Sequence, residues 1–342
     1  MTVDFTMPTN EELNEIAQEK AARLTMERRI FQILPTRDVN ASRVIWDQKD
    51  DYRGLQQLRG MNGQPPRVNL VGYKRYESRP GVYGEFTSLD EEMLTDRAAI
   101  ASYGVPMSIE DMIMDAQDML LQRRIDRMEK NGWDLLVNGN FSVYLPTGAV
   151  GHTDTYALQT FTADVDWSDH VNSKPLADLR EMKMLARGKG VSFGAGATLE
   201  FNQVTINHML SNRNQDDLAG KRMDGLATAL SVADVNKILT GEDLPSIRAN
   251  EDGWIDDNGD FQLFVPDGAG VLVGKRPVGQ RIGEIQLTRN AQNPDVKPGP
   301  YQYVKDMRRE KGEGVAEIQV HDGVNGGIAL FYPGSLVRVT VF

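Results

Sequence analysis

The chain has 342 residues, 40% of them hydrophobic, which is enough to build two or three compact units. It contains no cysteine, which excludes disulfides and thiolate metal sites. Its 49 acidic and 38 basic side chains give a formal net charge of -11, which argues against tight, sequence-independent DNA binding by the whole surface.

The N-terminal region predicts a helix followed by a polar arm. Thr9 and Glu12 have the spacing of a capping box, and apolar residues then recur at helical intervals: Leu13, Ile16, Ala17 and Leu24. The helical pattern stops near Pro35, and residues 36–67 are polar and mixed in charge. The chain shows neither a secretory signal nor a run of about 20 apolar residues, so we expect an intracellular product outside the membrane.

Residues 67–90 predict a long two-stranded ribbon. Aromatic and apolar side chains are spread among charged ones, and Arg79-Pro80-Gly81 is a turn signal. Because an isolated two-stranded hairpin is marginally stable in water, an ordered ribbon needs another surface, and a neighbouring copy is the simplest candidate. The alternative is that the aromatic residues face the core of their own chain.

Aromatic residues interleaved with arginine are typical of interface anchors, which favours the intermolecular interpretation. The residues predicted to lie in an inter-subunit interface are Tyr73, Lys74, Arg75, Tyr76, Glu77, Arg79, Tyr83 and Phe86.

The best-defined element follows a short helix expected at 91–103. Ser108 is a strong N-cap, and acidic residues at the start and basic residues at the end complement the helix dipole. Seven apolar residues form a continuous stripe: Ile109, Met112, Ile113, Ala116, Met119, Leu120 and Met128. A helix over 108–131 would be roughly 35 Å long, which is sufficient to form the spine of a domain.

The remaining segments mix strands and helices. Strand patterns cover 141–169, 254–287 and 315–342, and helical patterns start at Lys174-Pro175 and cover 222–239. Residues 198–212 fit either a strand or a helix. Regular βαβ alternation is missing, so the sequence predicts an α+β fold. We expect the C-terminal strands to share a sheet with residues near the long helix, and 175–296 to form an inserted unit.

No motif nominates a catalytic, cofactor-binding or metal-binding residue. The glycine-rich loop 188–196 lacks a following Gly-Lys-Ser/Thr and follows a helix, so a mobile loop is favoured over a phosphate site. The acidic turn 256–260 departs from a calcium loop, and Asn258-Gly259 favours a hairpin. The four histidines lack metal-ligand spacing, and no serine lies in a nucleophile elbow.

The order of these parts resembles the major capsid protein of tailed phages of the lambda type. The resemblance rests on the polar arm, the segment DYRGLQQLRGMNGQPPRVNLVGYKRYESRPGVYGEFTSLDEEMLTDRAA, the long helix after Ser108 and the C-terminal LFYPGSLVRVTVF. It implies the Johnson capsid fold of Hong Kong phage-like shells. Mapped onto this sequence, that fold gives an N-terminal helix and arm (1–66) and an extended E-loop (67–97). A peripheral domain (98–174 and 297–342) would hold the spine helix 108–131 and a sheet that uses Phe141–Leu145 and Val315–Phe342, and 175–296 would form the axial domain.

The resemblance also implies a function and partners. Family members assemble into pentamers and hexamers that close an icosahedral virion shell around double-stranded DNA, without sequence-specific binding. Scaffolding and portal proteins are expected partners, with a possible decoration protein, and the subunit would be made in the host cytoplasm. No cofactor is implied.

Two other functions stay open at this point. One is a protein-cargo compartment with the same fold. The other, from a different class, is a nucleotide- or calcium-dependent enzyme that uses the 188–196 loop or the 256–260 turn.

Overall fold

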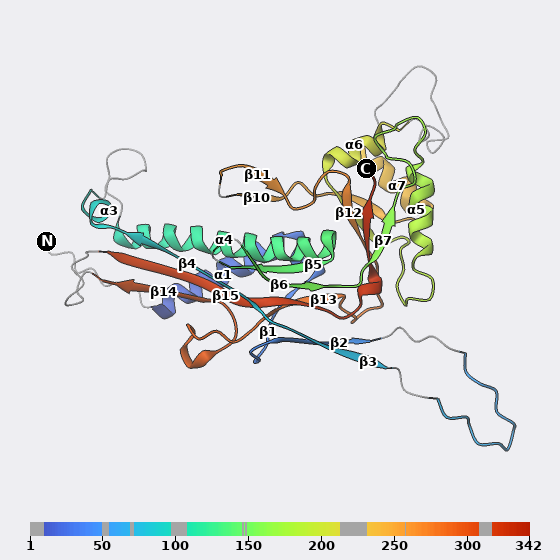
Figure 1. Ribbon diagram of the computed structural model, residues 1–342, viewed down its shortest axis with the longest axis horizontal. Helices are drawn as coiled ribbons and strands as arrows, with labels where there is room; N and C mark the ends of the chain where they lie inside the picture. The colour runs from blue at the N-terminus through green and yellow to red at the C-terminus, as the bar shows by residue number, and fades with distance from the viewer. Residues whose placement is uncertain are drawn as a thin grey trace. The chain divides into compact units, whose positions relative to one another are not determined.

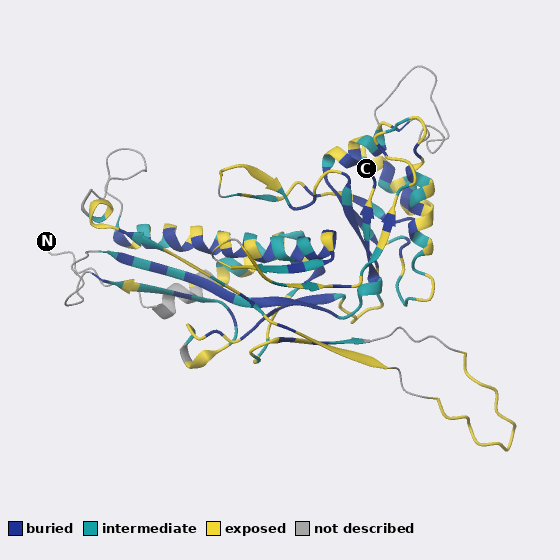
Figure 2. Cartoon of the chain, viewed as in Figure 1, coloured by how far each residue is buried: buried dark blue, intermediate teal, exposed yellow. Residues whose placement is uncertain are grey.

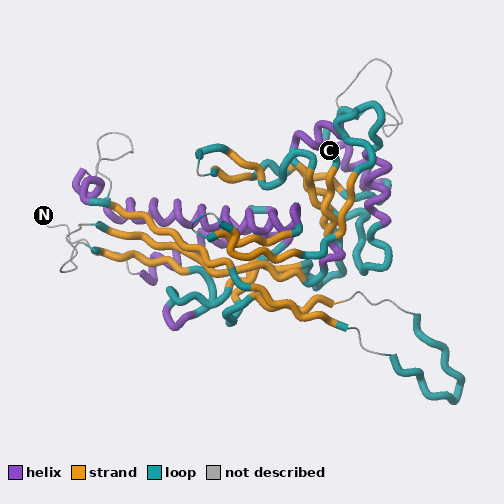
Figure 3. Tube along the Cα trace, viewed as in Figure 1, coloured by secondary structure: helices purple, strands orange, loops and turns teal. Residues whose placement is uncertain are grey.

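The computed structural model describes residues 10–49, 55–68, 72–96, 108–145, 147, 149–212, 231–256, 258–307 and 317–342 (Figures 1 and 3). The chain divides into two compact units. The first comprises Met1–Val44, Ser78–Glu129 and Ile285–Ile328, and the second comprises Ile45–Glu77, Lys130–Glu284 and Ala329–Phe342. Both combine helices with largely antiparallel sheets, as the α+β prediction requires.

The first unit is built on one sheet. Its strands follow the order β1 (Thr36–Asp38), β13 (Gly283–Leu287), β15 (Ile318–Leu330) and β14 (Tyr301–Asp306), and β4 (Gly81–Leu89) also pairs with β15. Both β4 and β14 run antiparallel to β15, whereas β1 is parallel to β13. Successive side chains of a strand point to opposite faces, so Ile318 and Val320 share one face and pack there against the long helix.

That helix, α4 (Ile109–Asn138), begins where the sequence predicts. The backbone N–H of Asp111 donates to Ser108 Oγ at 3.1 Å, which satisfies one of the unpaired donors of the first turn. The helix continues past the expected end at residue 131 because Trp133, Leu135 and Leu136, all fully buried, extend its apolar stripe. It ends at Gly139, whose φ of 73° suits glycine.

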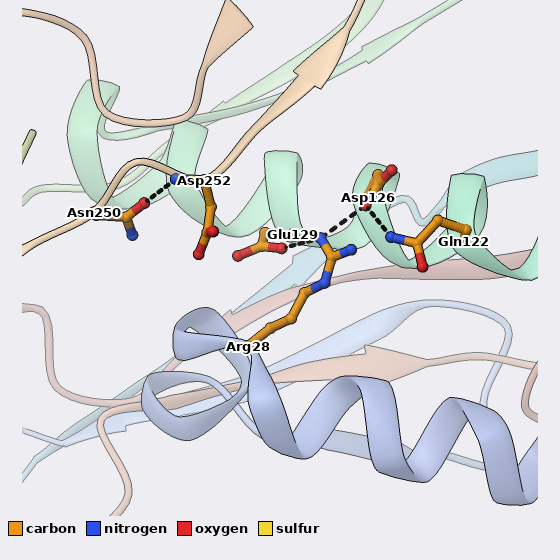
Figure 4. Close-up of polar contacts among 6 residues, drawn as sticks. All are labelled: Arg28, Gln122, Asp126, Glu129, Asn250 and Asp252. Atoms are coloured by element: carbon orange, nitrogen blue, oxygen red, sulfur yellow. Dashed lines mark hydrogen bonds and ion pairs between the residues drawn. The ribbon is translucent and has the colours of Figure 1, made fainter.

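The N-terminal helices are tied to α4 by ion pairs within the first unit. Arg28 connects α1 (Asn10–Glu27) to α2 (Arg29–Ile33). Its Nη1 lies 2.5 Å from Glu129 Oε2 and 2.7 Å from Asp126 Oδ1 (Figure 4). Burial opposes the charge on Arg28, but the two carboxylates raise its pKa above the ordinary value. Glu129 is itself fully buried, and its pair with Arg28 compensates its charge.

The second unit contains a sheet with the strand order β7 (Gln159–Thr162), β16 (Leu336–Thr340), β12 (Ala269–Val273), β8 (Thr198–Phe201) and β9 (Ser246–Ala249). One core cluster joins this sheet to three helices: α5 (Pro175–Met184), α6 (Gln203–Leu210) and α7 (Val232–Gly241). The ambiguous segment 198–212 therefore holds both a strand and a helix. Asn202 separates them, because its side chain accepts the Thr205 N–H at 2.9 Å and caps α6.

Two expectations about the strands are wrong. In the described residues, β5 (Asn140–Tyr144) pairs with β6 (Val150–Thr155) and not with the sheet under α4. The C-terminal segment also divides, with β15 in the first sheet and β16 in the second. The short helical turn Pro333–Ser335 separates these two strands, and Pro333 lacks the N–H that a continuing ladder would need. The second sheet therefore takes β7 and β16 from outside the range 175–296.

The remaining short elements match their predictions where they are described. The helix α3 (Glu91–Asp96) covers the start of the 91–103 prediction, and α7 covers part of 222–239. Residues 97–107 and 213–230 lie outside the described part of the chain, as does Thr9 of the predicted capping box. None of the helices in the described residues is both long enough and apolar enough to cross a membrane.

Candidate assembly interface

The ribbon is formed by different strands from those predicted. Strand β3 (Tyr73–Ser78) pairs with β2 (Val44–Lys49), which precedes it in the chain. The chain then passes through Arg79 and Pro80 into β4, which pairs with β15 along its whole length, from Gly81↔Gly326 to Leu89↔Ile318. The predicted hairpin turn at 79–81 is therefore wrong. Pro80 interrupts one ladder before the next begins, but the chain does not reverse there.

An aromatic stack holds the base of the β2–β3 ribbon. Trp46 is 7% exposed, and its ring stacks on those of Tyr76 and Tyr156, with centroid distances of 5.6 and 5.7 Å. Burial, with a smaller contribution from Asp154, raises the pKa of Tyr156, so its hydroxyl stays neutral. An ion pair from Arg75 Nε to Asp47 Oδ1, 2.8 Å long, joins the two strands. Sequence reasoning missed Trp46, although an isolated tryptophan in a polar arm is a usable signal.

The predicted interface residues fall into two groups. Tyr73, Lys74, Arg75, Tyr76 and Glu77 lie together on β3 and are exposed, although Arg75 and Tyr76 also make the contacts just described. Tyr83 and Phe86 lie on β4, in the sheet of the first unit, and Arg79 lies between the strands.

The β4 residues contact their own unit. The Arg127 guanidinium lies 5.8 Å from the centroid of the Tyr83 ring, on the α4 side of the sheet. Phe86 is on the other face, where it stacks on His321 at 5.2 Å and remains 59% exposed. The structure thus brings five of the eight predicted residues together on β3 and places Tyr83 and Phe86 in a different sheet.

Sequence reasoning also missed the loop that joins β2 to β3. Residues 55–68, here called the tip loop, extend beyond the two strands and are exposed throughout (Figure 2). Leu55, Leu58 and Met61 are 98, 99 and 98% exposed. The tip loop carries Arg59 and Arg67 but no acidic residue. Three fully exposed large apolar side chains on one loop are typical of a binding surface.

The loop and turn that suggested an enzyme have structural roles. Asp243 Oδ1 accepts the Ala195 N–H at 2.8 Å, and Asp243 also pairs with Lys183, so a carboxylate already occupies the glycine-rich loop. The Asp256 carboxylate accepts the N–H groups of Asn258 and Asp260, each at 2.9 Å, and thereby closes a hairpin. Among the described residues, no group of three or more His, Asp or Glu side chains is placed to hold a metal ion.

The family model of phage major capsid protein E matches residues 13–317. The chain belongs to this family. It is a capsid shell protein, located in the virion capsid, and its role in the particle is structural. The resemblance seen in the sequence is thereby confirmed. A comparison with curated protein sequences gives no match.

Solved structures share the fold of this capsid protein. The putative capsid protein of a prophage of E. coli CFT073 aligns with a TM-score of 0.57 and 12% identity, over 98% of this chain and 100% of that chain. A phage-related protein from Bordetella bronchiseptica RB50 aligns with a TM-score of 0.54 and 10% identity, over 94% of this chain and 96% of that chain. The capsid protein of a native GTA particle aligns with a TM-score of 0.50 and 8% identity, over 91% of this chain and 89% of that chain. At these identities the likeness concerns the fold alone, and that fold is the Johnson capsid fold predicted from the sequence.

Proposed function

We propose that the capsid protein assembles into pentamers and hexamers that close an icosahedral shell around double-stranded DNA. In this proposal the β2–β3 ribbon and its tip loop act as the E-loop and lie across an adjoining copy. The observation that carries the proposal is the near-complete exposure of Leu55, Leu58 and Met61 at the end of a ribbon whose base is fixed by Trp46.

The energetics support an intermolecular role for the tip loop. Burying a side chain of this size stabilises by about 1.5–3 kcal/mol, so three of them supply roughly 5–9 kcal/mol before the cost of ordering the loop. The Trp46 stack lowers that cost because the ribbon is already ordered at its base. A contact of this moderate strength, repeated around a ring, suits reversible assembly of a closed shell.

The net charge supports the proposed content of the shell. A formal charge of -11 lets DNA lie beside the subunit without tight phosphate contacts, which favours sliding during packaging. We assign residues 175–296, together with β7 and β16 of the same sheet, to the axial domain, and the rest of 98–174 and 297–342 to the peripheral domain. Scaffolding, portal and decoration proteins complete the proposed set of partners, and no catalytic activity is included.

A triple substitution of the tip loop tests the proposal. Leu55→Ser, Leu58→Ser and Met61→Ser together should leave a folded subunit with an unchanged thermal transition but prevent particle formation. Size-exclusion chromatography and electron microscopy report the assembly. Val278→Ser is the matched control, because Val278 is also fully exposed but lies in another loop. Particles from the triple variant in wild-type yield would contradict the proposal, and DNA or an enzyme recovered from wild-type particles would separate a virion shell from a cargo compartment.

A further inference from the structure

The five-stranded sheet of the second unit has two distinct ends, which the strand registers define. Strands β7 and β16 are parallel, from Gln159↔Val337 to Thr162↔Thr340, and β12 is antiparallel to β16, with Ala269 opposite Thr340. Strand β8 is antiparallel to β12 and parallel to β9. The segments after β7 and β9 therefore meet the segment before β12 at one end of the sheet. This end A comprises residues 163–167, 250–252 and 266–268, and the opposite end B comprises residues 189–197, 274–276 and 332–335.

End B carries positive charge. Lys275 follows β12, and its backbone N–H donates to the Ser192 carbonyl oxygen at 2.9 Å, which fixes the loop before β8 beside it. The Lys189 stem lies against Gly334, just before β16, because a Cβ at that glycine would be 3.4 Å from Lys189 Cδ. Within the described residues, neither Lys189 nor Lys275 forms an ion pair.

The carboxylates near end B are neutralised by helix α5. Glu242 and Asp243, which precede β9, pair with Arg180 at 3.1 Å and with Lys183 at 2.8 Å. Arg276, next in the chain after Lys275, adds a further cation at this end. The net charge that the described residues place at end B is therefore positive.

End A carries negative charge. Asp164 and Asp166 lie in the turn after β7, and both are exposed. The turn is fixed at this end of the sheet because the Trp167 N–H donates to the Val341 carbonyl oxygen at 2.9 Å. The two carboxylates are therefore held at the end of the sheet opposite to Lys189 and Lys275.

Further carboxylates add to the charge of end A. Glu251 follows β9 and Asp267 precedes β12, and both accept hydrogen bonds at the start of α6 while remaining exposed. In the described residues, Lys174 at the start of α5 and Arg248 on β9 are the cations near this end, and the carboxylates outnumber them. The sheet thus carries opposite net charges at its two ends.

We propose that end B of one copy docks on end A of an adjoining copy, with Lys189 and Lys275 against Asp164 and Asp166. This inference rests on the proposed function, in which the sheet belongs to the axial domain, and it adds a second contact between subunits. Within one copy the strands keep the two ends apart by roughly 15 Å, so the charges do not meet there. Because the contact joins two different surfaces, it is heterologous and repeats around a ring.

Reversing the charges tests the pairing. Lys189→Glu with Lys275→Glu makes both ends negative, and Asp164→Lys with Asp166→Lys makes both ends positive. Each double variant should lower particle yield at least about tenfold, because like charges then face each other. All four substitutions together should restore most of the yield, because opposite charges meet again.

The matched control reverses two lysines of the first unit. Lys297→Glu with Lys305→Glu makes the same chemical change at exposed positions and should leave particle yield unchanged. The thermal transition of unassembled subunits shows that each variant folds. Wild-type yield from either double variant at the sheet ends would overturn the contact.

Carbodiimide cross-linking of wild-type particles tests the contact without any substitution. The reagent joins a lysine amine to a neighbouring carboxylate as an amide and takes up the water that is lost. Mass spectrometry should then find Lys189 or Lys275 linked to Asp164 or Asp166 in particles but not in unassembled subunits.

The outcomes separate the two proposals. Particles without these cross-links, or a fourfold variant that assembles no better than the poorer double variant, overturn the contact while leaving the shell function in place. Failure of the wild-type chain to form particles overturns the proposed function, and the contact with it.

Discussion

At the scale of single residues, the first unit contains a buried ion pair whose charges are poorly compensated. Arg124 Nη1 lies 2.8 Å from Asp322 Oδ2, and the two side chains are 7 and 3% exposed. Burial raises the pKa of Asp322 to about 6, although Arg124 pulls it down and Glu85 adds to the rise. Burial also lowers the pKa of Arg124. Both shifts indicate that desolvation outweighs the attraction between the partners.

This pair predicts a pH dependence of subunit stability. The folded-state pKa of Asp322, about 6, lies above its ordinary value of 3.8, so between these values the folded protein binds a proton that the unfolded chain releases. The resulting stabilisation is fully present below 3.8 and is lost as the pH rises through 6. The free energy of unfolding of the wild type, relative to that of Asp322→Asn, should therefore increase by about 2 kcal/mol from pH 8 to pH 4. Urea titration of unassembled subunits at each pH measures the free energy of unfolding of both proteins. A difference between them that does not change with pH would contradict the raised pKa of Asp322.

The Arg28 cluster predicts a second residue-level effect. Arg28→Met removes the cation beside the fully buried Glu129 and should lower the free energy of unfolding by about 3–5 kcal/mol. Lys20→Met is the matched control on the same helical segment, since its pair with Asp118 is partly exposed and should be worth less than about 1 kcal/mol. Urea unfolding measures both variants. Equal losses of unfolding free energy would show that the burial of Glu129 does not determine the destabilisation caused by Arg28→Met.

At the scale of elements, the Trp46 stack is the feature that orders the ribbon. Trp46→Ala removes both ring contacts, so amide hydrogen exchange should accelerate in β2 and β3. Exchange in β12 and β16, which lie in the second sheet, serves as the internal control and should stay slow. Unchanged exchange in β2 and β3 would mean that cross-strand contacts such as Arg75–Asp47 hold the ribbon without the tryptophan.

Elements whose residues carry local signals could be predicted from the sequence. The Ser108 cap located the start of α4, and Asn258-Gly259 located the hairpin of β10 (Gly253–Ile255) and β11 (Phe261–Leu263), because caps and tight turns depend on neighbouring residues. Strand partners depend on contacts distant in sequence. The alternation in 67–90 is compatible with β3 pairing either with β4 or with β2, and the tertiary structure chooses β2.

The candidate site was predictable to a similar extent. Aromatic and charged residues on β3 identified the ribbon, but its apolar tip at Leu55, Leu58 and Met61 was hidden in a segment rich in Gln, Gly and Pro that reads as a polar arm. Only the fold shows that these three side chains are exposed and that the described part of the chain leaves them uncovered.

At the scale of the whole molecule, family membership and fold establish a capsid shell subunit, and the ribbon supplies the proposed means of joining copies. The chain places apolar surface on the tip loop, where the described part of its own fold does not bury it. A protein that acted as a monomer would expose this surface to water, whereas a closed shell can bury it in every copy.

An electron cryomicroscopy reconstruction of particles formed by the purified wild-type chain tests this account most directly. The account predicts a closed shell of five- and six-subunit capsomers in which residues 55–68 lie against the adjoining copy. A shell in which that loop folds back onto its own subunit, or a folded chain that forms no shell at all, would contradict it.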